Sequence, residues 1–491
     1  MRKQFFLLGM LLWVAGVHAQ NPQKSKLQDS FDAFRKGLHE DFDNFRQQCM
    51  QEYAQFVRNP WVEFDHVKPV PLPKVQPVPP VVVPEEDTRP PIEDRPIVIE
   101  ELVRPKPVEP QPQPVEPIEE VPVVQPKTLA FTFFGTQGRV RFDTADRVAL
   151  HTTAADNVAD ALALFTPEAY DNMLYDCLQL RANLQLSDWA YLQMLKTLSE
   201  TAAGKGTNDA TLLLAWLFMQ SGYQMRLATD NQRLYMLYAT RHTIYGQMSY
   251  TIDNTCYYGV ETLPSRLFIC KAAFPHERAL SLLVGTQQRF ADNAGTRRTI
   301  TSKRYSDISM QVSVNKNLMD FYSSYPTSMT DGNMMTRWAM YANTPMDAAV
   351  ARQVYPTLRQ KLSGLSQLEA VERLLNMVQT GFEYEYDDKV WGGDRAFFAE
   401  ESLYYPYCDC EDRSILLTRL VRDLLGLKCL LIYYPGHLAA AVAFTEGNVA
   451  GDYLTVDGRR YVVTDGTYIG APVGRTMPGM DNKTAKVIVL E

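Results

Sequence analysis

The sequence is poor in several features that would assign a function at once. It has no strongly basic tract and a formal net charge of -8, so we expect no nucleic-acid partner. Beyond the N-terminal apolar stretch, no run is long enough to cross a bilayer, so we expect no integral membrane segment in the mature chain. Its seven cysteines and seven histidines, in 491 residues, lack the repeated pairs that hold structural zinc. We therefore expect no metal and no cofactor.

The chain begins with a segment typical of export. Two basic residues at positions 2 and 3 precede an apolar run from Phe5 to Val17, and small residues lie just before position 20. This order predicts a signal peptide over residues 1–19 and a periplasmic or secreted protein. An exported protein meets oxidising conditions, and Cys256 and Cys270 are the pair that we expect to form a disulfide. The odd cysteine count leaves at least one thiol over.

Residues 27–58 are predicted to form one amphipathic helix. Its apolar residues recur every three or four positions: Phe31, Phe34, Leu38, Phe42, Phe45, Cys49, Tyr53 and Phe56. Such a narrow stripe docks on the globular part of its own chain or associates with a second copy. The mixed charge of the opposite face argues against a membrane-surface helix.

Residues 69–127 hold 18 of the 30 prolines and a net charge of -5, from 11 acidic and 6 basic residues. This composition cannot build a core, so we expect an extended, acidic linker. Residues 128–345 follow as a mixed α/β region. Within them, the stretch from Thr207 to Leu217 parallels the stretch from Cys410 to Leu420, with Thr207 in place of the cysteine. The parallel raises the hypothesis of a degenerate second copy that cannot perform thiol chemistry.

Cys410 carries the strongest chemical signal of the chain. Asp409 is a good helix N-cap, and the apolar positions that follow fit one buried helix face: Leu416, Leu417, Leu420, Val421, Leu424 and Leu425. Gly426 would end this helix. Cys410 would then lie in the first helical turn, where free backbone N–H groups and the helix dipole favour a thiolate.

A histidine and an aspartate follow in positions that suit the same chemistry. His437 begins an apolar strand after a Pro-Gly turn, and Asp465 comes directly after another strand. In thiol acyl transfer, an imidazole accepts the thiol proton and a carboxylate orients the imidazole. The two side chains can meet only if their strands are antiparallel neighbours. We therefore predict that residues 445–458 extend the hairpin and do not insert a full strand between them.

These residues resemble the transglutaminase-like superfamily, whose fold is papain-like. The resemblance rests on Asp409 to Asp412 opening a leucine-rich helix, on the strand led by His437, and on Asp465-Gly466-Thr467, where the family commonly has Asp-Pro-Thr. It implies a transglutaminase-like domain over residues 346–491, with Cys410 as nucleophile, His437 as base and Asp465 as orienting carboxylate. The fold class that we expect is thus α+β.

The resemblance implies an enzyme that acts on protein or peptide amides through a thioester. Water as acceptor would make it a peptidase or amidohydrolase, and a lysine amine would make it a transglutaminase; bacterial members are often hydrolases. The alternative is a noncatalytic scaffold that uses the same fold for binding. A third interpretation has Cys408, Cys410 and His437 as metal ligands, but three ligands without a fourth argue against it.

Overall fold

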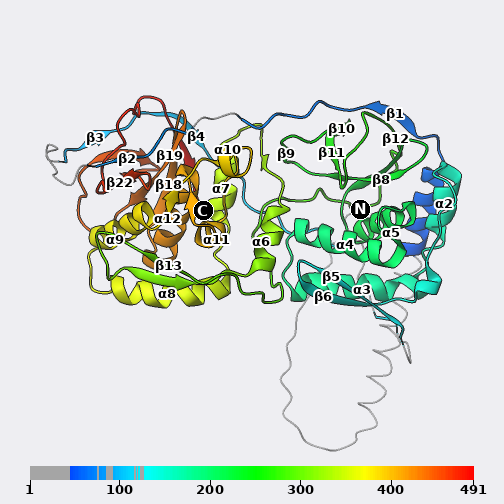
Figure 1. Cartoon of the computed structure of the whole chain (residues 1–491). Coiled ribbons are helices and arrows are strands. Elements are labelled where there is room, and N and C mark those ends of the chain that lie inside the picture. Colours follow the sequence, from blue (N-terminus) through cyan, green and yellow to red (C-terminus); the bar gives the residue numbers. More distant parts are fainter. Residues whose placement is uncertain (1–44, 74–76, 84–91, 115–117, 119, 122–125) are drawn as a thin grey trace, which may run out of the picture.

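The computed structural model describes residues 45–73, 77–83, 92–114, 118, 120–121 and 126–491. They form two lobes side by side, each with a sheet and helices packed on it, so the chain is an α+β protein as predicted (Figure 1). The predicted signal peptide and the first part of the predicted N-terminal helix, residues 27–44, lie outside the described residues. Within the described part, no helix has the length and apolar character needed to span a membrane.

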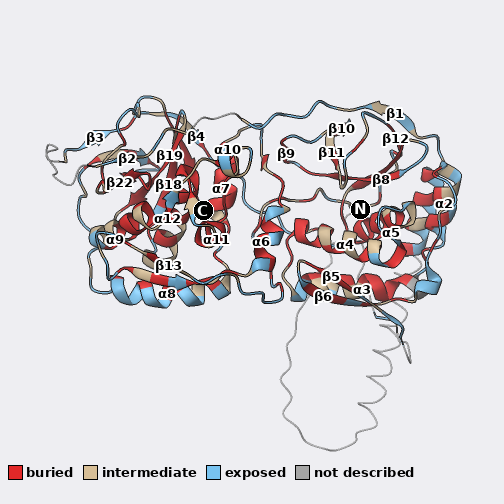
Figure 2. Cartoon of the chain, viewed as in Figure 1, coloured by how far each residue is buried: buried red, intermediate tan, exposed pale blue. Residues whose placement is uncertain are grey.

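A seven-stranded sheet forms the centre of the C-terminal lobe. From one edge to the other its strands are β3 (Arg95–Pro96), β20 (Asp452–Val456), β21 (Arg459–Thr464), β19 (His437–Ala443), β18 (Lys428–Tyr434), β23 (Ala485–Val489) and β4 (Ile99–Val103). The strands from β20 to β23 are antiparallel, and the two edge strands pair in parallel. Every residue of β19 is buried, because helices cover one face of the sheet and loops the other (Figure 2).

Helices of the C-terminal lobe surround one long central helix. They are α7 (Thr336–Asn343), α8 (Ala348–Leu362), α9 (Gln367–Thr380), α10 (Asp387–Val390), α11 (Ala399–Tyr404) and α12 (Cys410–Leu425). The helix α12 packs on β18 and β19 and contacts α7, α8, α9 and α11. Short pairs complete this lobe: β13 (Arg298–Thr301) with β14 (Ser309–Val312), β16 (Glu383–Tyr384) with β17 (Tyr407–Cys408), and β2 (Val81–Val82) with β22 (Tyr468–Ile469). Because β13, β14 and α7 pack here, the lobe includes segments on the N-terminal side of the boundary expected at residue 346.

The N-terminal lobe has a six-stranded sheet. In order, its strands are β1 (Val62–Asp65), β12 (Arg266–Ile269), β7 (Met225–Thr229), β8 (Leu234–Ala239), β11 (Thr255–Gly259) and β10 (Ser249–Ile252). Its helices are α2 (Ala155–Ala163), α3 (Pro167–Asn183), α4 (Asp188–Ala203) and α5 (Asn208–Gln220). The other elements are β5 (Thr128–Phe133), β6 (Thr136–Arg141), η1 (Thr144–Asp146), β9 (Thr243–Ile244), β15 (Ser328–Met329) and α6 (Lys316–Ser323).

The two sheets share one connectivity. In each lobe a long helix ends at a glycine with positive φ (Gly222 and Gly426) and leads into an antiparallel hairpin. The second hairpin strand pairs with a later strand that closes its own hairpin, β8 with β11 and β19 with β21. The first hairpin strand pairs with the last strand of its sheet, β7 with β12 and β18 with β23. The hypothesis of a degenerate copy, which rested on leucine spacing in the sequence, is therefore also supported by the shared strand order.

The proline-rich segment expected to be a free linker is instead paired with both lobes where it is described. Strands β3 and β4 extend the C-terminal sheet at its two edges, and β2 pairs with β22. Farther on, the Pro112 carbonyl accepts a hydrogen bond of 2.9 Å from Arg181, and Gln111 donates one of 2.6 Å to Leu186. The expectation of a separate spacer was wrong for these residues, because extended chain can pair with a sheet edge without building a core of its own.

The described part of the N-terminal helix, residues 45–57, docks on the N-terminal lobe. The Tyr53 ring packs edge-on against Phe274 at 5.9 Å, and the Arg46 guanidinium pairs with Asp171. Phe56 of the predicted stripe stays 62% exposed. Of the two expectations for this helix, docking on its own chain is the one that the structure contains.

The expected disulfide between Cys256 and Cys270 is absent, and both residues are free thiols. Cys256 lies on β11 and Cys270 follows β12, with β7 and β8 between these strands. Neighbouring strands are about 4.8 Å apart, so three strand spacings exceed the 7 Å that a disulfide can bridge between Cα atoms. Sequence proximity across a turn-rich segment was misleading here.

Candidate active site

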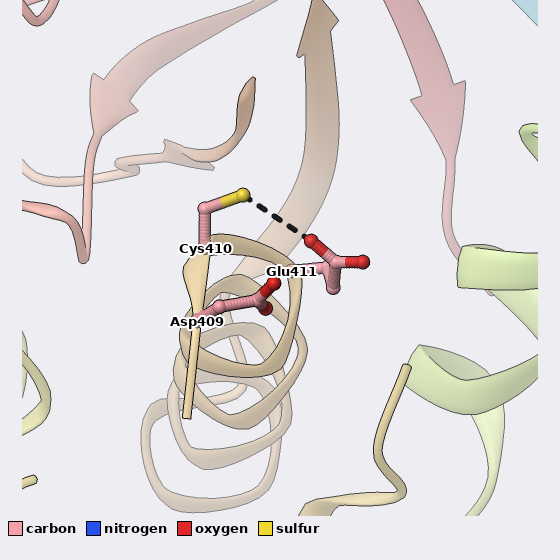
Figure 3. A group of neighbouring side chains, drawn as sticks. All are labelled: Asp409, Cys410 and Glu411. Atoms are coloured by element: carbon pink, nitrogen blue, oxygen red, sulfur yellow. Dashed lines mark hydrogen bonds between the residues drawn. The ribbon is translucent and has the colours of Figure 1, made fainter. Parts of the chain in front are cut away.

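Cys410 is the first residue of α12, next to Asp409 and Glu411 (Figure 3). The helix begins here because the Asp412 carboxylate accepts the Asp409 backbone N–H, and it ends at Gly426, which takes the left-handed conformation that a helix C-terminus favours. The Cys410 thiol is 3% exposed, and its Sγ donates a hydrogen bond of 3.2 Å to Glu411 Oε2.

His437 and Asp465 meet as the sequence predicts. His437 Nε2 lies 2.8 Å from Asp465 Oδ2, and both side chains are almost fully buried. The contact forms because β19 and β21 are direct antiparallel neighbours, with β20 on the outer side of β21. The prediction that residues 445–458 do not insert a strand between His437 and Asp465 is confirmed.

His437 and Cys410 line one pocket. Its lining also includes Pro77, Arg337, Trp338, Asp394, Glu411, Tyr433, Gly436 and Leu438. His437 Nδ1 is buried and has no hydrogen-bond partner among the described residues. Since Nε2 is engaged by Asp465, Nδ1 is the ring nitrogen left for a reacting group in the pocket.

Buried side chains that sequence reasoning missed hold the loops of this site together. Gln379 Nε2 donates to the carbonyls of Asp465, Tyr468 and Ala471 at 3.0, 2.8 and 3.1 Å. Arg413, 1% exposed, donates to the Gln379 and Gly466 carbonyls, at 3.2 and 3.4 Å. Neither side chain stands out in the sequence, because a polar residue within a helix gives no sign of the loop carbonyls that it will meet.

Gly466, the residue after Asp465, has a packing reason to lack a side chain. A Cβ atom at Gly466 would lie 3.1 Å from Arg413 Cβ and 3.4 Å from Val378 Cγ1. The first of these distances is tighter than an ordinary contact, so the close approach of α12 favours a residue without a side chain here.

The electrostatics of the resting site favour a neutral thiol. Burial raises the pKa of Cys410 well above its usual range, the Glu411 and Asp409 carboxyls raise it further, and a backbone hydrogen bond from Leu438 opposes them. Burial and the nearby Glu411 also raise the pKa of Asp387, to about 8. The site thus concentrates buried carboxyl groups beside the cysteine.

An arginine from a neighbouring helix balances part of this acidity. The Arg337 guanidinium, 1% exposed, pairs with Asp394 and lies 4.8 Å from the centre of the Trp338 ring. Two sets of described side chains are close enough to share a cation, Asp409 with Cys410 and Glu411, and Asp387 with Asp394 and Glu411. Neither set includes Cys408 or His437, the partners that the metal interpretation of the sequence gave to Cys410. The buried guanidinium already supplies positive charge to the second set.

The N-terminal lobe has a pocket at the matching place. Leu234 begins β8 as His437 begins β19, each opposite the last residue of the first hairpin strand. Val260 donates its backbone N–H to the carbonyl of Met236, the second residue after Leu234. In the same way, Asp465 lies opposite the second residue after His437 on β19. Thr207, Leu234 and Val260 all line this pocket. The N-terminal lobe therefore lacks the thiol, the imidazole and the carboxylate at these positions.

Comparison of the chain with protein-family models, with curated proteins and with solved structures finds no match. The resemblance to the transglutaminase-like superfamily therefore rests on the chain's own residues.

Proposed function

We propose that this protein is an exported thiol enzyme of transglutaminase-like type that acts on peptide or protein amides. Cys410 would be the nucleophile, His437 the general base and Asp465 the carboxylate that orients the imidazole. The observation that carries the proposal is the 2.8 Å contact between His437 Nε2 and Asp465, which leaves Nδ1 unpaired in the pocket that Cys410 lines. A carboxylate on one ring nitrogen keeps the proton there, so the other nitrogen can accept the thiol proton.

The reaction would proceed by two acyl transfers. His437 Nδ1 takes the proton of Cys410 as the sulfur attacks the amide carbon, and the same proton then passes to the leaving amine. The resulting thioester is attacked by water, giving an acid, or by a primary amine, giving a new amide; either restores the thiol. The backbone N–H of Cys410, at the N-terminus of α12, would stabilise the negative oxygen of each tetrahedral intermediate.

Hydrolysis is our preferred outcome, because water needs no binding site of its own. Glu411 would have to release the thiol hydrogen bond before the proton can pass to His437. The buried thiol and its raised pKa favour the alternative, a noncatalytic scaffold, if that hydrogen bond persists when a peptide binds.

A thiol-directed acylating probe distinguishes these functions. We expect labelling of the reduced wild-type protein and none at this site in Cys410→Ala, with His437→Ala slowing the reaction by at least about tenfold. Cys408→Ala is the matched control, since that thiol lies two residues away and is also buried. Labelling that is equal in the His437→Ala variant and the wild type would favour the scaffold.

A further inference from the structure

The active-site pocket is bordered by a stretch of the proline-rich segment. Pro77 lines the pocket together with Cys410 and His437. The next residue, Val78, donates its backbone N–H to the Gly436 carbonyl at 2.8 Å, immediately before His437 in the chain. The proline-rich segment therefore reaches the triad at the residue that precedes its histidine.

From there the stretch runs along the loop that follows Asp465. Val81 and Val82 pair in parallel with Tyr468 and Ile469, and Val83 donates its N–H to the Ile469 carbonyl at 2.9 Å. The Asp465 carboxylate accepts the backbone N–H groups of Thr467 and Tyr468, at 2.8 and 3.3 Å, so the strand that receives the stretch is fixed to the triad itself.

Within the stretch only Pro79 and Val82 are exposed, and the other side chains are half-buried. Val78, Val81 and Val83 pack against an apolar cluster formed by Tyr468, Ala471 and Met477. Val82 points away from it and is 65% exposed. Backbone pairing at a strand edge, combined with pockets for particular side chains, is a way in which an extended peptide is recognised.

Resting on the function proposed above, we propose that the surface under Pro77–Val83 is the substrate groove of the enzyme. It accepts peptides in extended conformation with β-branched apolar residues at the positions that Val78, Val81 and Val83 occupy, and the chain's own Pro77–Val83 competes with them for it. This accounts for a triad whose three side chains are at most 3% exposed. Substrate can reach Cys410 only after this stretch leaves the groove.

The test compares inward-facing with outward-facing valines in the full-length chain. The double variant Val81→Asp/Val83→Asp places two carboxylates against the apolar cluster, and Val82→Asp adds one at the exposed position. We expect the rate of Cys410 alkylation by iodoacetamide to rise at least about tenfold in the double variant and to stay unchanged in Val82→Asp. Equal rates in the double variant and the wild type would overturn the proposal. Circular dichroism checks that both variants fold.

A peptide competition separates groove binding from loosening of the domain. A peptide with the sequence of residues 77–83 should slow alkylation of the double variant, and the same peptide with aspartate in place of the two inward valines should not. No protection by the first peptide would contradict the proposed groove.

His437→Ala in the double variant isolates the proposed catalysis. A fast alkylation that no longer depends on His437 would leave the groove intact and remove the proposed enzyme. If alkylation depends on His437 but the valine substitutions do not speed it, the proposed enzyme stands and the proposed groove is contradicted.

Discussion

The two lobes share their strand order and differ in the chemistry placed on it. At the start of the long helix the C-terminal lobe has Cys410, and the corresponding stretch of the N-terminal lobe has Thr207. At the start of the second hairpin strand His437 corresponds to Leu234, and at the end of the next strand Asp465 corresponds to Val260. Both lobes keep a pocket at this place. The N-terminal lobe thus forms the same strand order without Cys410, His437 or Asp465. These residues are therefore not needed for folding, which supports a functional reason for them in the C-terminal lobe.

Removing the Cys410 thiol should abolish acyl transfer by the C-terminal lobe, and this is the strongest effect that we predict. Cys410→Ala should lower thioester formation by at least about a thousandfold, because no other group in the pocket can form the covalent bond. Thr207→Ala is the matched change in the other lobe and should leave the rate unchanged. Mass spectrometry of the acylated protein measures both. A thioester that forms equally well in Cys410→Ala would show that another thiol reacts.

A smaller loss should follow from removing the charge that orients the imidazole. In Asp465→Asn the amide N–H₂ would face Nε2, so Nε2 would become the acceptor and Nδ1 would carry the proton. Nδ1 could then no longer accept the thiol proton, and Cys410 alkylation at pH 7 should slow by about tenfold or more. Val260→Thr, the near-isosteric change at the matching position, should have no effect. An unchanged alkylation rate in Asp465→Asn would exclude this role for the carboxylate.

The C-terminal lobe should lose stability as the pH rises, and the N-terminal lobe should lose stability as the pH falls. Burial raises the pKa of Glu400 and of Glu401 to about 7, so the folded C-terminal lobe keeps protons that the unfolded chain releases above about pH 4. Its stability therefore falls as pH rises from about 4 to 7, by about 1.4 kcal/mol per pH unit for each group. Burial lowers the pKa of His242 to about 4, so the folded N-terminal lobe binds fewer protons than the unfolded chain. That lobe loses stability as pH falls from about 6.5 to 4.

Hydrogen exchange, followed in α12 and α5 as a function of pH, separates the two trends. Glu400→Gln should flatten the loss of protection in α12 at rising pH, and His242→Gln should flatten the loss in α5 at falling pH. The same pH dependence in both helices would contradict the assignment of these groups to separate lobes.

The smallest effect compares the glycines that end the two long helices. Both have positive φ, so alanine at either costs about 1 kcal/mol of backbone strain. A Cβ at Gly222 would also lie 2.0 Å from the Gln113 carbonyl oxygen of the proline-rich segment, whereas Gly426 faces open space. Gly222→Ala should therefore destabilise the protein by about 2 kcal/mol more than Gly426→Ala in urea unfolding. Equal effects would mean that the proline-rich segment yields at Gln113 without cost.

The parts of the site that could be predicted are those with strong local rules. The residues that cap and terminate a helix, and the apolar face between them, locate the start of α12 at Cys410. The Pro-Gly and Asp-Gly turns fix the β18–β19 and β20–β21 hairpins. The pairing of β19 with β21, which brings Asp465 to His437, joins these two hairpins. The supporting contacts of Gln379 and Arg413 could not be predicted, because they join a helix to loops some 30 to 90 residues away along the chain.

The proline-rich segment shows the opposite case. Its composition indicates correctly that the segment has no core of its own. The composition does not show that strands elsewhere in the chain offer unpaired backbone groups to β2, β3 and β4. The disulfide expected between Cys256 and Cys270 failed for a related reason, since strand order decides which residues are neighbours.

Local sequence patterns are enough to place each reactive group on its element: a thiol at a helix start, an imidazole at a strand start and a carboxylate after a strand end. Folding brings Cys410 and His437 to one pocket with Asp465 bound to the imidazole, surrounds the thiol with carboxyl groups, and lays Pro77–Val83 along this site. The two kinds of information differ in the separation along the chain over which the interactions act. Caps, turns and side-chain periodicity act over a few residues, whereas burial, charge and edge pairing depend on segments that meet only when the chain folds.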